Sequence, residues 1–163
     1  MLTIGCDPGL TGALCLIDAH RQLLEVADIP TTENGLTSGS MKRWVDDSAL
    51  AELLADWSRR HEMAVHVVAA ALERPIPMPR LPAQTIASQF DTFGVVRAHL
   101  GRFARLHYPT PHAWKKRFGV GHDKDEARAC CLRLYPDAPV KRVKDHNRAE
   151  AILMAHWLHA ELA

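Results

Sequence analysis

Residues 4–18 read IGCDPGLTGALCLID, two apolar runs separated by the turn-forming sequence DPGLTG. This pattern predicts two β-strands joined by a tight turn. Asp7 is an exception to this apolar pattern, because its carboxylate stands at the end of a strand that is otherwise typical of a buried core. Asp7 fits two roles: it accepts hydrogen bonds from the amides of the turn, or it binds a divalent cation beside glycines that let a phosphate approach.

Length and composition predict a single domain, residues 1–163. Of the 163 residues, 47% are hydrophobic, which suits one sizeable core better than two. The chain has no run of about 18 apolar residues and no signal-peptide pattern at its start, so we expect a cytoplasmic protein without a membrane span. Its four cysteines lack CxxC spacing, which favours reduced side chains that serve in core packing.

The distribution of charge is more informative than its sum. The formal net charge is only +1, which by itself does not indicate nucleic-acid binding. Lys and Arg residues, however, crowd between Arg97 and Arg148. A basic face of this kind can follow a phosphate backbone, and the same residues also fit an ordinary solvated helix surface.

The order of elements predicts an α/β domain with a mixed sheet. We expect a third strand at 21–30 and a polar loop at 31–40. Residues 64–73 form a Val-rich run typical of a strand buried on both faces, so a helix should cover each face of the sheet. Four prolines make 74–82 a stiff loop. Helical spacing predicts helices at 47–60, capped by Asp47 or Ser48, and at 84–100, 123–135 and 146–162, with a short strand and a helix start within 107–118.

Two further carboxylates stand at informative places. Glu73 ends the buried strand, and Glu150 lies in the first part of the last helix. Carboxylates at the ends of adjacent strands repel each other, and a cation relieves that repulsion. His146 precedes Glu150 by four residues and shares its helix face, while Asp145 fits either a metal ligand or the helix N-cap. Oxygen ligands favour Mg²⁺ or Mn²⁺ over Zn²⁺, and two such ions would support phosphodiester hydrolysis.

The chain resembles the RuvC-like Holliday junction resolvases of the RNase H and retroviral-integrase superfamily, particularly their small phage and prophage branch. The matching segments, in order, are IGCDPGLTGALCLID, ADIPTTE, AALERPIPMPR, SQFDTFGVVRAHL, PHAWKKRFGV, DKDEARACCLRLYP and KDHNRAEAILMAHW, which cover nearly the whole chain. The resemblance implies an RNase H-like fold, a mixed five-stranded sheet flanked by helices in a single domain.

The resemblance also implies roles for the acids. Asp7 would bridge two Mg²⁺ ions, Glu73 would be the second ligand and Glu150 the acid of the last helix, with Mn²⁺ as a substitute metal. The commonest family pattern has an Asp three residues before the last acid, where this chain has Asn147, a weaker and uncharged ligand. We expect His146 to be the fourth ligand, because imidazole occurs in this role within the family, with Asp145 as the alternative.

Junction DNA presents mostly phosphate, so its affinity should come from Lys and Arg. In related resolvases the loop after Glu73 probes the unpaired junction centre, and an apolar side chain there would act as a wedge between bases. Trp114 fits either base stacking or a place in the core. The DNA-binding candidates are Ile76, Met78, Arg80, Lys115, Lys116, Arg117, Lys124 and Arg128.

Residues Gln89, Phe90 and Phe93 resemble the family's dimer segment, although a core stripe explains the same spacing. Symmetric nicking of two strands requires two active sites, so we expect a homodimer.

Together these inferences predict a Mg²⁺-dependent endonuclease that resolves four-way DNA junctions by symmetric paired nicks and leaves 5′-phosphate ends. The catalytic residues would be Asp7, Glu73, His146 and Glu150. Two alternatives stay open: a less selective nuclease for branched DNA or flaps, and a junction-binding protein whose catalytic site is weakened by Asn147. A protein of the sugar-kinase type is not expected, because it would need a second, adenosine-binding domain.

Overall fold

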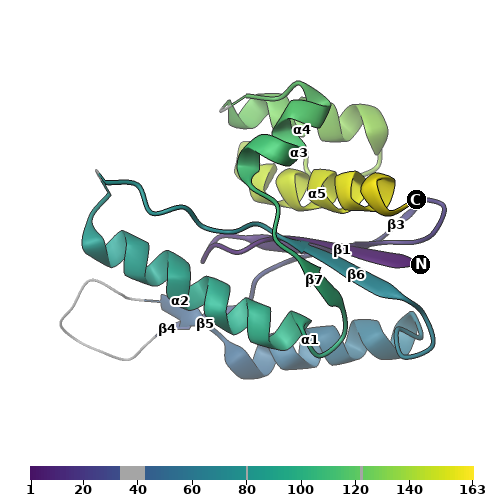
Figure 1. Cartoon of the computed structure of the whole chain (residues 1–163), viewed down its shortest axis with the longest axis horizontal. Helices are drawn as coiled ribbons and strands as arrows, with labels where there is room; N and C mark the ends of the chain where they lie inside the picture. Colours follow the sequence, from purple (N-terminus) through teal and green to yellow (C-terminus); the bar gives the residue numbers. More distant parts are fainter. Residues whose placement is uncertain (34–42, 80, 122) are drawn as a thin grey trace.

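The computed structural model describes residues 1–33, 43–79, 81–121 and 123–163. Five strands form one mixed sheet in the order β3-β2-β1-β6-β7 (Figure 1). The β1–β2 and β2–β3 pairs are antiparallel, whereas the β1–β6 and β6–β7 pairs are parallel. The predicted mixed five-stranded sheet is therefore confirmed. Its strands are β1 (Leu2–Asp7), β2 (Ala13–Ile17), β3 (Leu23–Asp28), β6 (Val68–Leu72) and β7 (Arg105–His107).

Helices cover both faces of the sheet, as the doubly buried strand predicted. One face packs against α1 (Asp47–Arg60) and α2 (Ala83–Leu100). The other packs against α5 (His146–Leu162), which α4 (Lys124–Leu134) covers in turn. The short helices α3 (Pro111–Phe118) and η1 (Val143–Asp145) also contact α5. Figure 1 shows α1 and α2 below the sheet and α3, α4 and α5 above it.

The side chains of β1 alternate between the two cores. Leu2, Ile4 and Cys6 are buried in the core beneath α1 and α2. Thr3 faces α5 instead, with its hydroxyl 3.3 Å from Nδ1 of the buried His159. The two-residue period of a strand then assigns Gly5 and Asp7 to the α5 face as well.

Gly5 is the point at which α5 touches the sheet backbone. A Cβ on Gly5 would lie 1.9 Å from the carbonyl oxygen of Ala151 and 2.7 Å from the amide nitrogen of Ala155. Ala151 and Ala155 are themselves fully buried. These small side chains thus let α5 pack closely on the sheet.

The strand expected at 64–73 is shorter than the sequence suggested. Pairing with β1 begins at Leu2 opposite Val68, so the residues before Val68 have no strand beside them and form turns. Val65 and Val67 are consequently exposed despite their apolar character. No helix in the described ranges is both long and apolar enough to span a bilayer.

Two smaller predictions also need correction. Helix α1 has the predicted bounds, but its N-cap is Asp46, whose carboxylate accepts a hydrogen bond from the amide of Ala49 at 2.9 Å. A two-stranded ribbon of β4 (Thr31–Glu33) and β5 (Arg43–Val45) begins within the loop expected at 31–40. Residues 34–40 of that loop lie outside the described residues.

Gly5→Ala should destabilise the fold, because the new Cβ would overlap the backbone of α5 rather than a flexible side chain. We expect the free energy of unfolding to fall by at least about 1–3 kcal/mol, measured by urea denaturation. Gly94→Ala is the matched control: its Cβ would meet nothing within 4 Å, and it lies inside α2, where Ala is favoured over Gly. Equal stability of Gly5→Ala and the wild type would contradict the direct contact between β1 and α5.

Candidate active site

The register of the two central parallel strands places two carboxylates side by side. Cys6 of β1 is paired with Leu72 of β6, and the amide of Glu73 donates to the carbonyl of Cys6 at 3.2 Å. The residues that follow this pair, Asp7 and Glu73, therefore stand at the same level where the strands end. Cys6 and Leu72 both face the core beneath α1 and α2, so alternation turns both acids toward α5.

Helix α5 adds the third predicted carboxylate. The helix runs antiparallel to β1: its end contacts Thr3 through His159, its middle contacts Gly5, and its start reaches the level of Asp7. Glu150 lies in this first part and is near enough for its charge to act on both Asp7 and Glu73. The structure thus brings together the three acids predicted from the sequence.

Asp7 carries the clearest sign of their mutual repulsion. Burial, followed by the negative charges of Glu150 and Glu73, raises the pKa of Asp7 to about 8, against the opposing effect of Lys115 and Lys124. Burial also raises the pKa of Glu73, although a hydrogen bond from Trp114 lowers it. Carboxylates that disfavour one another's charge create the electrostatic condition that a divalent cation relieves.

Helix α3 supplies two partners for these acids that the sequence did not reveal. Trp114 is fully buried, and its Nε1 donates to Oε2 of Glu73 at 2.7 Å. Lys115, the next residue, places Nζ 3.0 Å from Oε1 of Glu150. Of the two roles considered for Trp114, the core role is confirmed. Lys115, predicted to bind DNA, neutralises part of the acid cluster in this structure.

The ends of α3 explain why these two residues are held in place. Pro111 occupies the start of the helix, where its fixed φ suits the first turn and its missing N–H is not needed. Gly119 follows the last residue with φ of 64°, and its amide donates back to carbonyls of the last turn. Both boundary residues are visible in the sequence, but the partners of the side chains between them are not.

The three acids fit a hard divalent cation by their chemistry, since they offer only oxygen donors. Within the part of the chain that the structure describes, however, no three His, Cys, Asp or Glu side chains stand in a ready geometry for a metal ion. In this structure Lys115 pairs with one oxygen of Glu150, so a cation held by Glu150 and Asp7 would compete with that ion pair.

The candidates for a fourth ligand lie in different environments. Asp145 is only 4% exposed, and its carboxylate accepts hydrogen bonds from the guanidinium of Arg142, at 2.7 Å from Nη2, and from the Arg142 amide at 2.9 Å. Arg142 also lowers the pKa of Asp145 to about 2. Asp145 occupies the N-cap position of α5, but its side chain does not cap that helix. The predicted cap role is therefore wrong, because the carboxylate forms an ion pair with Arg142 instead, and its role as a metal ligand stays a prediction.

His146 and Asn147 stand on the first turn of α5. The Nδ1 atom of His146 lies 3.2 Å from the carbonyl oxygen of Val143, which leaves Nε2 for another partner. Asn147 donates from Nδ2 to the carbonyl oxygen of Thr11 at 2.5 Å and lies 3.0 Å from its hydroxyl. Because a carbonyl only accepts, the amide nitrogen must face Thr11, and the amide oxygen of Asn147 points elsewhere. Asn147 thus ties the turn after Asp7 to α5.

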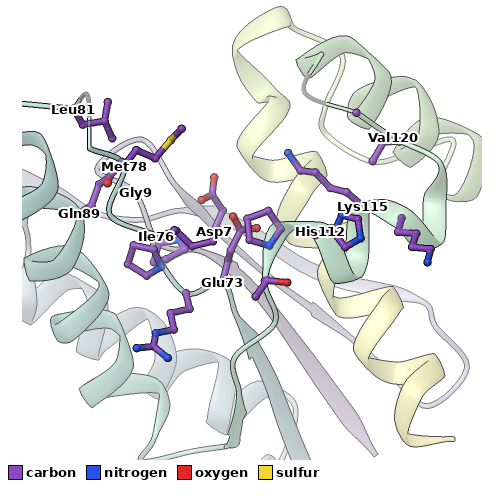
Figure 2. A pocket seen from close by; sticks show the side chains of 17 residues that line it. Asp7, Gly9, Glu73, Ile76, Met78, Leu81, Gln89, His112, Lys115 and Val120 are labelled. Atoms are coloured by element: carbon purple, nitrogen blue, oxygen red, sulfur yellow. The ribbon is translucent and has the colours of Figure 1, made fainter.

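A pocket of about 810 Å³ lies over Asp7 and Glu73 (Figure 2). Ile76 and Met78 line one side, and both are exposed in the proline-rich loop that follows Glu73. His112 and Lys115 line the opposite side, and Lys116, the next residue of α3, also lines the pocket. His112 is a lining residue that sequence reasoning did not single out. The pocket therefore joins an acidic floor to one apolar wall and one basic wall.

The remaining DNA-binding candidates are placed differently. The positive charge of Lys124, at the start of α4, lowers the pKa of Asp7. Arg117 is exposed near the end of α3. Arg128 is used within the fold: it donates to the carbonyl of Val140 at 3.2 Å and to that of Lys141 at 2.9 Å. In this structure Arg128 holds the loop before η1, and its role in DNA binding stays a prediction. Arg80 lies outside the described residues.

The three residues predicted for a dimer interface do not share one environment on α2. Phe90 is 39% exposed. Phe93 packs against the core beneath α2, with its ring centroid 6.0 Å from that of Tyr108. Gln89 lines the pocket over Asp7. Of the three, Phe90 is therefore the side chain that presents a large apolar surface to solvent.

The mixed five-stranded sheet with helices on both faces is an RNase H-like fold, and the acids lie at the ends of its central strands. Among solved structures, the chain is similar to Thermus thermophilus RuvC in complex with a Holliday junction substrate, with a TM-score of 0.61 and 13% identity over 100% of this chain and 96% of that one. It is also similar to another Thermus thermophilus RuvC structure, with a TM-score of 0.56 and 15% identity over 99% and 96%. At these identities the likeness establishes the fold. No protein-family model and no curated protein matches the chain.

The raised pKa of Asp7 predicts that the metal-free protein loses stability as pH rises. The unfolded chain releases this proton near pH ~4, whereas the folded chain keeps it until about pH 8, so the folded state binds more protons between these values. The free energy of unfolding should therefore fall across this window. Asp7→Asn should remove most of the slope in thermal unfolding in EDTA and raise the melting temperature at its alkaline end.

Asp56→Asn is the matched control for that experiment, because Asp56 forms exposed ion pairs on α1, on the opposite face of the sheet. It should keep the wild-type slope. The same pH dependence in Asp7→Asn and the wild type would contradict the environment described for Asp7.

Asn147→Asp should weaken the tie between α5 and the turn after Asp7. A carboxylate cannot donate to the carbonyl of Thr11, so we expect the metal-free protein to lose about 1 kcal/mol of unfolding free energy. Thr11→Val is the matched variant, since it keeps the carbonyl and removes only the hydroxyl, and it should cost less. Urea denaturation in EDTA measures both, and a more stable Asn147→Asp protein would overturn the assigned hydrogen bond.

Proposed function

We propose that this protein is a metal-dependent endonuclease that resolves four-way DNA junctions. The observation that carries the proposal is the cluster of Asp7, Glu73 and Glu150, which lies beneath a pocket with a basic and an apolar wall. Burial and then repulsion from the other two acids raise the pKa of Asp7. The fold shared with a RuvC that was solved with a Holliday junction substrate supports the junction as the substrate.

Asp7 would hold both Mg²⁺ ions, Glu73 one of them, and Glu150 with His146 the other; Mn²⁺ would substitute. Such ions activate a water and stabilise the leaving oxygen in phosphodiester hydrolysis. The amide oxygen of Asn147 is a further, uncharged donor on the same helix turn. On binding of the cations, Lys115 would exchange Glu150 for a phosphate of the substrate, because its ammonium is then freed beside the pocket.

The walls of the pocket suit two parts of a branched DNA. Lys116 lines the pocket and the charge of Lys124 reaches Asp7, so both would offer positive charge to the phosphates, and Arg117 would extend that surface along α3. Ile76 and Met78 stand out from the proline-rich loop on the other side, where they would enter between unstacked bases at the junction centre. The site would release a 5′-phosphate and a 3′-hydroxyl at each nick.

Paired nicks require two active sites, and a two-fold homodimer would supply them. The exposed ring of Phe90 on α2 makes this helix the proposed interface, with Gln89 beside it at the mouth of the pocket. The site would then place two symmetric cuts across one junction.

Two other functions share most of these features. A less selective nuclease for branched DNA or flaps would use the same acids and differ only in substrate preference. A junction-binding protein with a weakened site is favoured by one observation: Asn147 contributes no charge where the commonest family pattern has an acid, and its amide nitrogen is bound to Thr11.

The decisive test is nicking of a synthetic four-way junction, beside duplex, flap and single-stranded controls, in Mg²⁺, Mn²⁺, Ca²⁺ or EDTA. We expect symmetric nicks in Mg²⁺ and Mn²⁺ that are confined to the junction. Asp7→Asn should lower the nicking rate at least about 100-fold, as expected when an activating metal ligand is lost, while junction binding in Ca²⁺ is kept. Asp56→Asn should retain the wild-type rate.

Each alternative has its own signature in this experiment. Equal cleavage of flaps and junctions would replace the proposal with the less selective nuclease. Tight junction binding without nicks in the wild type, together with nicking by Asn147→Asp, would replace it with the weakened junction-binding protein. Full activity of Asp7→Asn would refute the assigned site.

A further inference from the structure

Two consecutive residues of α3 contact two different acids of the site, and they do so by different chemistry. Lys115 forms an ion pair with Glu150 through the ammonium group of its flexible side chain. Trp114 donates a hydrogen bond to Glu73 from the neutral N–H of its fully buried indole ring. A bound cation competes with the charge of Lys115, whereas it does not compete with a neutral donor to the same degree. The two contacts should therefore behave differently when metal binds.

We propose that Trp114 is a positioning residue that holds the Glu73 carboxylate in the orientation required for metal binding. Its indole has a single N–H, which engages Oε2, so the other oxygen of Glu73 stays available for a cation. Since Glu73 was assigned as a metal ligand, this inference rests on the proposed function.

The rigidity of Trp114 comes from its surroundings. Its ring belongs to the core between α5, α4 and the sheet, together with Cys131 and Ile152. The helix that carries it is fixed at its start by Pro111 and at its end by Gly119. Packing in the core therefore fixes the position of Nε1 in the free protein, before any substrate binds.

Glu73 needs such a partner because of where it stands. It follows the last residue of β6, and the chain continues into the proline-rich loop. A Glu side chain has three rotatable bonds, and ordering it reduces its conformational entropy. A donor fixed by the core restricts the carboxylate in advance, so metal binding has less left to order. Outer hydrogen bonds of this kind commonly change metal affinity by about 10–100-fold.

The test measures Mn²⁺ binding to the free protein by isothermal titration calorimetry, so that its readout does not depend on nicking. Trp114→Phe removes the N–H and keeps an aromatic ring in the core. We expect it to weaken Mn²⁺ binding by about tenfold. Trp57→Phe is the matched control, because Trp57 is an equally buried indole on α1, on the other face of the sheet. It should lose similar packing and keep the wild-type affinity.

A double variant separates positioning from a general effect on folding. Glu73→Gln removes the carboxylate on which Trp114 acts. In that background Trp114→Phe should change Mn²⁺ affinity by less than about twofold, because the affected interaction is already absent. An unchanged affinity in Trp114→Phe, or the same tenfold loss in the presence and absence of Glu73→Gln, would overturn the proposal.

The same titration distinguishes this inference from the proposed function. If Trp114→Phe weakens Mn²⁺ binding but the wild-type protein nicks no junction, the nuclease proposal is rejected and the positioning role of Trp114 is supported. If the wild-type protein nicks junctions but Trp114→Phe leaves the Mn²⁺ affinity unchanged, the nuclease proposal is supported and the positioning role is rejected. A wild-type protein that binds no Mn²⁺ would reject both.

Discussion

The contact between the backbone of β1 at Gly5 and the backbone of α5 sets the geometry of the candidate site. An added Cβ would lie 1.9 Å from the Ala151 carbonyl oxygen, so only glycine lets the helix rest on the strand. The first turn of α5 is then tied to the sheet at two further points. Arg148 pairs with Asp28 at the end of β3, with Nε 2.5 Å from Oδ1, and Asn147 donates to Thr11. A helix held in this way keeps Glu150 at the level of Asp7.

The parts of this arrangement that follow local rules could be predicted from the sequence. Periodicity gave the strands around the DPGLTG turn and the bounds of α1 and α5, because these patterns report which side of an element is buried. Asp7 and Glu73 stood out because each interrupts or ends an apolar run. Their proximity follows once the two strands are parallel neighbours in register, a relation that the pairing of Cys6 with Leu72 shows.

The choice of partner among polar side chains could not be predicted in the same way. Trp114 and Glu73 are 41 positions apart, and Asn147 and Thr11 are 136 apart, so no local pattern reports either contact. Asp145 illustrates the same difficulty at short range, since Arg142 captures a carboxylate that by position suits a helix cap. Several partners lie within reach of each such group, and small differences in orientation decide between them.

The acid cluster lowers the stability of the folded chain, and neighbouring side chains compensate part of that loss. Three carboxylates in a partly buried position destabilise the folded chain, which is why the pKa of Asp7 is raised. Lys115 and Trp114 offset part of that cost, the first through charge and the second through a neutral hydrogen bond. In the proposed enzyme a cation would take over the role of Lys115, and Trp114 would keep its hydrogen bond to Glu73. The stability given up in the free protein would thus be recovered on metal binding, as expected of a site whose residues are selected for function rather than for the fold.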